Sequence, residues 1–153
     1  MASGPTRGVI RAFLDANVLF SAAQSRGGMS WRAVELAGIR DDLSVITTEY
    51  ALDEAERHLR EKDPASLGEY EHLTTLVETC PAPPGPLTRH VRWLVKDEKD
   101  WPILAGAISA EADWLLTKDG KHFGHLYGVQ VYDVFITTPA AGLHRFGERA
   151  GVL

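Results

Sequence analysis

The chain has 153 residues, of which 44% are hydrophobic and 24% are charged, as in a soluble folded protein of one domain. Its formal net charge of −5 argues against a protein that grips nucleic acid mainly through a basic surface. No apolar run approaches the roughly 20 residues needed to cross a bilayer, so we expect no membrane partner.

The N-terminus and the cysteine content bear on the compartment. No signal-peptide stretch is present, because the apolar run Val9–Leu14 is short and contains Arg11. The single cysteine, Cys80, cannot form an internal disulfide. We therefore expect a cytoplasmic protein with one domain over residues 1–153 and a flexible N-terminus over residues 1–8.

Predicted strands and helices alternate along the chain. In the first half we expect a strand at 9–14, a short helical turn at 18–23, a loop at 24–28, a helix at 30–39, a strand at 43–46, a helix from Thr47 or Thr48 to about 61, and a helix at 67–79. Residues 81–86 contain four prolines and predict a loop.

In the second half we expect a helical segment at 87–95, a helix at 102–111, a strand at 114–117, a turn at 119–120, a strand at 129–132 and a helix at 139–146. Strands that alternate with helices imply βαβ units and an α/β fold with a mainly parallel sheet covered on both faces.

Two acidic residues follow predicted strands of this sheet. Asp15 closes the first strand and Asp119 follows the strand at 114–117. Ligands of such sheets bind beyond the carboxyl ends of the strands, where the strand order reverses. Carboxylates gathered there repel each other unless they take up protons or a cation, and hard ions such as Mg²⁺ prefer oxygen ligands. This placement points to metal-assisted phosphodiester chemistry.

Each candidate also has a structural interpretation. Asp15 could cap the following helix, although Asn17 offers a second polar group at the same strand end that could hold the carboxylate in place. Asp119 precedes Gly120 in an ordinary turn dipeptide, and Thr117 could orient its carboxylate.

The helix predicted up to residue 61 offers Glu54 and Glu56 on opposite borders of its buried stripe, so periodicity does not choose between them. Either could be a solvated charge that pairs one turn along the helix. Asp100 stands in phase with the buried stripe of the next helix, an odd place for an unpaired charge. It could instead cap that helix, in which case Asp97 is the alternative ligand.

Other motifs are weaker. His122 and His125 are three residues apart, with no third ligand at the spacing of a zinc site. A phosphatase of the haloacid-dehalogenase type also uses an Asp after its first strand, but it needs a second Asp where this chain has Asn17. No phosphate-binding glycine loop is present.

Four segments together resemble the PIN domain family. They are Asp15-Ala16-Asn17-Val18-Leu19 after an apolar strand, Glu54-Ala55-Glu56-Arg57-His58-Leu59, Asp100-Trp101-Pro102-Ile103-Leu104-Ala105, and Leu115-Leu116-Thr117-Lys118-Asp119. The resemblance favours Glu54 over Glu56. Lys118 and Trp101 depart from the smaller residues usual at those positions, but neither departure removes a ligand.

The resemblance implies a three-layer α/β/α sandwich and Mg²⁺- or Mn²⁺-dependent hydrolysis of single-stranded RNA. Asp15, Glu54, Asp100 and Asp119 would hold one or two metal ions. Asn17 and Thr117 would orient these ligands, while Arg57, Lys118 and Lys121 are candidate phosphate contacts. Many small members resemble VapC toxins that an antitoxin neutralises, and a homodimer is expected. The non-enzymatic alternative is a catalytically silent PIN-fold module that binds nucleic acid or protein.

Overall fold

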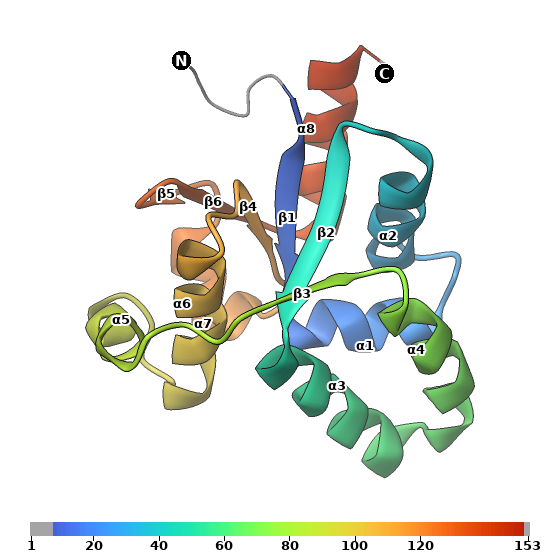
Figure 1. The fold of residues 1–153 in the computed structure, drawn as a ribbon, viewed down its shortest axis with the longest axis horizontal. Coiled ribbons are helices and arrows are strands. Elements are labelled where there is room, and N and C mark those ends of the chain that lie inside the picture. The colour runs from blue at the N-terminus through green and yellow to red at the C-terminus, as the bar shows by residue number, and fades with distance from the viewer. Residues whose placement is uncertain (1–7, 152–153) are drawn as a thin grey trace.

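Six strands in the described residues, 8–151, form one sheet in the computed structural model (Figure 1). They are β1 (Ile10–Leu14), β2 (Leu43–Thr48), β3 (Glu78–Cys80), β4 (Trp114–Leu116), β5 (Gln130–Val131) and β6 (Val134–Thr137). Their order is β3-β2-β1-β4-β6-β5, and every neighbouring pair is parallel except β5 with β6. The expected α/β fold with a central, mainly parallel sheet is confirmed.

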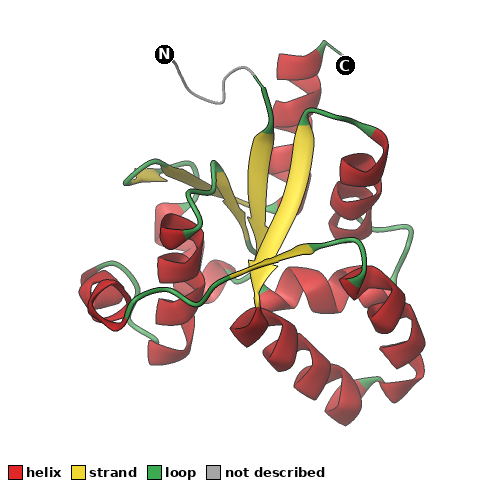
Figure 2. Ribbon diagram, in the orientation of Figure 1, coloured by secondary structure: helices red, strands yellow, loops and turns green. Residues whose placement is uncertain are grey.

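Helices connect these strands and cover both faces of the sheet (Figure 2). They are α1 (Ala16–Gln24), α2 (Met29–Ile39), α3 (Glu49–Lys62), α4 (Leu67–Thr74), α5 (Gly85–His90), α6 (Trp101–Ser109), α7 (Gly120–Phe123) and α8 (Pro139–Ala150). Helices α2 and α8 pack against each other, whereas α6 packs against β2, β4 and α5. Helix α1 contacts α2, α3 and α4.

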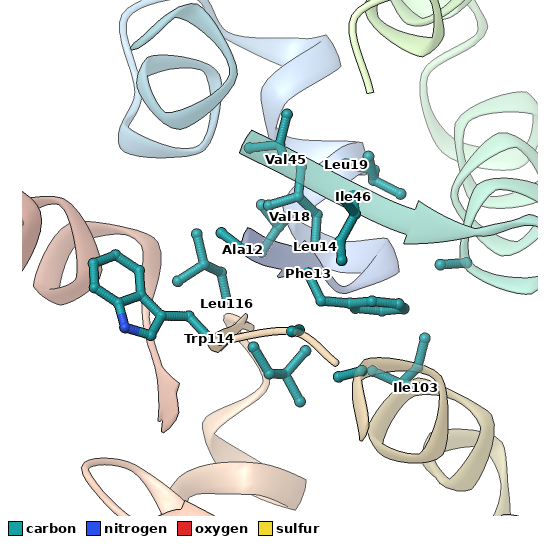
Figure 3. Close-up of a cluster of buried hydrophobic side chains, with 14 of the residues drawn as sticks. Ala12, Phe13, Leu14, Val18, Leu19, Val45, Ile46, Ile103, Trp114 and Leu116 are labelled. Carbon is teal, nitrogen blue, oxygen red and sulfur yellow. The ribbon is translucent and has the colours of Figure 1, made fainter. Parts of the chain in front are cut away.

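Side chains of the central strands fill the space between sheet and helices (Figure 3). A Cβ on Gly106 would lie 3.2 Å from the Phe13 ring, so Phe13 points toward α6. A Cβ on Gly142 would lie 2.9 Å from Leu116 Cδ2, so Leu116 points toward α8. Phe13 is in register with Leu115, and successive strand residues point to opposite faces. Helices α6 and α8 therefore cover opposite faces, which gives the three-layer sandwich.

The apolar character of β1 follows from its place in the middle of the sheet. Four of its five residues are buried, because β2 and β4 pair with its edges and helices cover its faces. Its carboxyl end and that of β4 lie side by side, with Leu14 opposite Leu116. The residues that follow these two strands are thereby brought together.

Two expected elements differ from the structure. The helix expected over 67–79 ends at Thr74, and Glu78–Cys80 forms the edge strand β3 instead. The strand expected at 129–132 is the two-residue β5, which pairs with the unanticipated strand β6. The chain reverses between them, and Tyr132 there has a φ of 55°, in the left-handed region. A hairpin therefore replaces the single strand.

Smaller differences concern element ends. The turn expected at 18–23 is the longer helix α1, and α5 begins inside the proline segment, at Gly85. No helix in the described part of the chain is long and apolar enough to pass through a membrane. The flexible segment expected over residues 1–8 lies, apart from Gly8, outside the described residues.

Candidate metal centre

Asp15 lies at the carboxyl end of β1 and is only 4% exposed. Its Oδ1 accepts a hydrogen bond from the backbone N–H of Ala16 (2.6 Å), which begins α1. Its Oδ2 accepts one from the hydroxyl of Thr117 (2.8 Å). The pKa of Asp15 is raised to about 7, above all because burial removes the carboxylate from water. The negative charges of Asp100 and Asp119 raise it further, against the two hydrogen bonds.

Asn17 and Thr117 hold the ends of β1 and β4 together. The side-chain amide of Asn17 donates to Asp15 Oδ2 (3.3 Å), and its oxygen accepts from the backbone N–H of Lys118 (2.9 Å). The hydroxyl oxygen of Thr117 also accepts from the backbone N–H of Asp119 (3.1 Å). These bonds fix the orientation of Asp15 relative to the segment that carries Asp119.

Asp100 ends a short 3₁₀ turn (Glu98–Asp100) directly before α6. Asp97 caps this turn by accepting from the backbone N–H of Lys99 (3.0 Å), whereas the side chain of Asp100 makes no capping hydrogen bond. Asp100 thus occupies the N-cap position of α6, but its side chain does not satisfy a backbone donor there. Its Oδ2 is buried and has no hydrogen-bond partner. Burial, and then the charge of Asp119, raise the pKa of Asp100 to about 6.

The two glutamates of α3 that periodicity could not separate have different surroundings. Glu56 accepts two hydrogen bonds from Arg60, the shorter at 2.7 Å, on the exposed side of the helix. Glu54 has a side chain that is only 16% exposed and lies 3.8 Å from the Arg57 guanidinium. Glu54 also lines the same small cavity as Asp15. The structure thus separates the two by their environment.

Asp119 is brought to this cavity by the start of α7. Its Oδ1 accepts from the backbone N–H of His122 (3.1 Å), which places the imidazole one turn along beside the carboxylates. His122 Nδ1 lies 2.8 Å from both Asp119 Oδ2 and Asp100 Oδ2, and its Nε2 lies 3.5 Å from Asp97 Oδ2. Sequence reasoning missed this histidine, because it was considered only as a zinc ligand paired with His125.

The cavity has a volume of about 120 Å³ and lies where the strand order reverses, beyond the carboxyl ends of β1 and β4. All four predicted carboxylates line it, together with the other residues Ala16, Asn17, His58, Lys99 and His122. Oxygen donors of this kind suit a hard divalent cation, and the buried Asp100 Oδ2 has no hydrogen-bond partner. The residues present therefore fit a metal ion.

None of the three predicted phosphate-contacting cations lines this cavity, although Arg57 and Lys121 line neighbouring ones. Arg57 is exposed and is within 4 Å of Glu54 and Glu61. The ammonium of Lys118 donates to the Ser21 hydroxyl (2.9 Å). Lys121 lines a neighbouring cavity of about 510 Å³, which His122 also lines. Sequence reasoning missed Lys99, which lines the acidic cavity itself.

Comparison with known proteins identifies the family of this arrangement. The sequence model of the PIN domain matches residues 11–121, which include every carboxylate of the cavity and most of the chain. No curated protein sequence matches the chain.

Three solved structures share the fold at low sequence identity. VapBC2 from Rickettsia felis, bound to a DNA fragment from its promoter, has a TM-score of 0.63 and 14% identity, covering 84% of this chain and 98% of that one. A Pyrobaculum aerophilum protein has a TM-score of 0.63 and 15% identity, covering 91% and 96%. Mycobacterium tuberculosis VapC20, described as a sarcin-ricin loop cleaving toxin, has a TM-score of 0.52 and 18% identity, covering 71% and 90%. These similarities concern the fold.

Proposed function

Because the chain belongs to the PIN domain family, we propose that it is a metal-dependent endoribonuclease that hydrolyses phosphodiester bonds of single-stranded RNA. The observation that carries the proposal is the meeting of four carboxylates, each from a separate segment, in one cavity at the carboxyl edge of the sheet. Raised pKa values at Asp15 and Asp100 support it, since such shifts concentrate at functional sites.

In this scheme Asp15, Glu54, Asp100 and Asp119 hold Mg²⁺ or Mn²⁺. A bound divalent ion supplies Lewis-acid activation of the attacking water and neutralises charge that develops on the phosphate oxygens. The protein contributes the positions of the ligands. Asn17 and Thr117 keep the Asp15 carboxylate oriented through their hydrogen bonds. Asp15 and Asp100 are both buried, and the charge of Asp100 acts on Asp15. A bound cation would therefore offset the repulsion between them.

The negatively charged RNA must approach this acidic cavity along cationic side chains. Lys99 lines the cavity, and Lys121 lines the neighbouring one. Arg57 and Lys118 lie farther out, each with a polar partner that a phosphate would replace. Contacts to phosphates confer affinity without base recognition, so this set favours binding of the RNA backbone.

We further propose that the protein acts in the cytoplasm as the toxin of a toxin–antitoxin pair and forms a homodimer. The fold similarity to the VapBC2 complex and to VapC20 supports a toxin of this kind. In this arrangement an antitoxin protein covers the acidic cavity and silences it. Co-expression with the product of an adjacent gene tests the toxin–antitoxin pairing. Analytical ultracentrifugation of the purified chain, alone and with that product, tests the homodimer and the complex.

Cleavage of a labelled panel of single-stranded RNAs tests the enzyme proposal. Wild-type protein and Asp100→Asn are compared in EDTA, in Mg²⁺ and in Mn²⁺. We expect cutting by wild type only with metal, and a loss of roughly 10²–10³-fold in the variant, the size typical for removal of one charge-stabilising group. Metal binding by the wild type without any cutting would refute the enzyme proposal and support the silent binding module.

A further inference from the structure

Within the described residues, His122 is the one side chain with a nitrogen atom in contact with two of the predicted metal ligands, Asp100 and Asp119. Its Nδ1 is 2.8 Å from Asp100 Oδ2 and 2.8 Å from Asp119 Oδ2, yet it is buried and makes no hydrogen bond of acceptable geometry. Asp100 Oδ2 is likewise buried and unpaired. Both carboxylate oxygens thus lie close to the same ring nitrogen, but no hydrogen bond joins either of them to it.

These separations match those between neighbouring ligand atoms of one metal ion. Bonds of about 2.1 Å at right angles place adjacent ligand atoms about 3 Å apart around an octahedral ion. Independently of Asp119, ligand atoms of Asp97, Asp100 and His122 all lie within 4.8 Å of one another. Asp100 and His122 are therefore close enough to share a cation, and Asp97 lies beside them.

The Asp97 carboxylate lies beside the other nitrogen of the His122 ring. Its Oδ2 lies 3.5 Å from His122 Nε2, on the opposite side of the ring from Nδ1. A histidine that binds a metal through one nitrogen usually directs its other N–H to a carboxylate or carbonyl, which fixes the tautomer. With the proton on Nε2, the lone pair of Nδ1 faces Asp100 and Asp119.

We propose that His122 is a fifth metal ligand, and that its nitrogen makes the centre favour first-row transition ions over Mg²⁺. This inference rests on the proposed metal-dependent function and specifies its ion. Imidazole binds transition metals well, whereas Mg²⁺ prefers oxygen ligands and keeps its waters. A site made of four carboxylates alone offers only oxygen ligands and has no such preference for transition ions.

Pulsed electron paramagnetic resonance of the protein loaded with Mn²⁺ alone tests the proposal without RNA. A coordinated imidazole produces a ¹⁴N modulation in the echo decay, and the wild type is expected to show it. His122→Gln should lose the modulation and bind Mn²⁺ at least about tenfold more weakly by calorimetry, with a smaller change for Mg²⁺. Circular dichroism establishes that the variant is folded.

The matched control is His58→Gln. His58 lines the same cavity, but within residues 8–151 it forms no ion pair with a carboxylate; its ring lies near Phe20 and Arg57. This variant should keep both the modulation and the Mn²⁺ affinity. Loss of the modulation in His58→Gln instead of His122→Gln would overturn the assignment.

The outcomes separate this inference from the proposed function. Wild type that binds Mn²⁺ without ¹⁴N modulation overturns the inference, because no imidazole is then bound to the ion. The proposed RNA cleavage does not depend on that result. Wild type that shows the modulation but cuts no RNA upholds the ligand and refutes the nuclease. Wild type that binds neither ion overturns both.

Discussion

The two ends of the parallel sheet use aspartate in opposite ways. At the amino end, Asp42 precedes β2 and accepts two hydrogen bonds from Arg40, at 2.9 and 3.0 Å, which lower its pKa. Asp113 precedes β4 and accepts from the backbone N–H of Arg11 at 2.8 Å. At the carboxyl end, Asp15 and Asp100 are buried among other acids and their pKa values are raised.

The contrast distinguishes acidic residues that stabilise the fold from acidic residues whose ionised form destabilises it. At the amino end, Asp42 and Asp113 have their partners within the chain. At the carboxyl end burial opposes the ionisation of Asp15 and Asp100, and a bound cation would relieve this cost. Paired carboxylates at one edge and crowded, buried carboxylates at the other thus distinguish a structural edge from the proposed metal-binding edge of the same sheet.

The largest difference between the two ends should be catalytic. Asp15→Asn and Asp113→Asn make the same isosteric change at opposite ends of the sheet. We expect RNA cleavage to fall by roughly 10²–10³-fold in Asp15→Asn, since a charged ligand is lost, and to stay at the wild-type rate in Asp113→Asn. Single-turnover cleavage assays in Mn²⁺ measure both. Equal rates for Asp15→Asn and wild type would remove the basis of the comparison.

The second difference should appear in stability against pH. The folded-state pKa of Asp15 is raised from 3.8 to about 7, so the folded chain holds this proton more tightly than the unfolded chain. The resulting stabilisation is complete below about pH 3.8 and is lost as pH rises through about 7.

Metal-free Asp15→Asn should therefore gain stability relative to metal-free wild type as pH rises, by up to about 4 kcal/mol between about pH 4 and pH 8. Urea unfolding in EDTA measures this difference. Saturating Mn²⁺ at the higher pH should favour the wild type again, because the ion binds only the folded ligand set. A difference that does not change with pH would contradict the raised pKa.

The smallest effect should be at the amino end. Asp113→Ala leaves the backbone N–H of Arg11 without its acceptor, and we expect the free energy of unfolding to fall by about 1 kcal/mol. Cleavage by the folded variant should match wild type. Thermal unfolding and the RNA assay together check this, and loss of cleavage in a fully folded Asp113→Ala protein would show that the two ends are coupled.

Most of the fold could be predicted because its signals are local. The apolar runs of β1, β2 and β4 and the periodicity of α6 are visible in the sequence. The hairpin of β5 and β6 was missed because a left-handed residue, Tyr132, makes the turn without glycine there. Strand β3 was missed because three residues that pair with β2 continue a pattern that looks helical.

The part of the site that could be predicted consists of acidic residues marked by a strand end or by the period of a buried helix face. Asp15 and Asp119 follow strands, and Asp100 stands in phase with a buried stripe, so each could be singled out. Glu54 could not be told from Glu56 by period, since the distinction depends on which border of α3 faces the cavity. His122 could have been found from its position three residues after Asp119, because an Asp that caps a helix brings that residue beside it.

The Thr117–Asp15 hydrogen bond joins residues 102 positions apart in the chain. A cavity closed by such a bond does not exist in a nascent or partly unfolded chain, which therefore has no matching affinity for metal. An ion that binds only the folded chain shifts the folding equilibrium toward the folded state by mass action. Less unfolded chain is then available for proteases to cleave. If the centre binds as proposed, metal supply governs the lifetime of this protein as well as its chemistry.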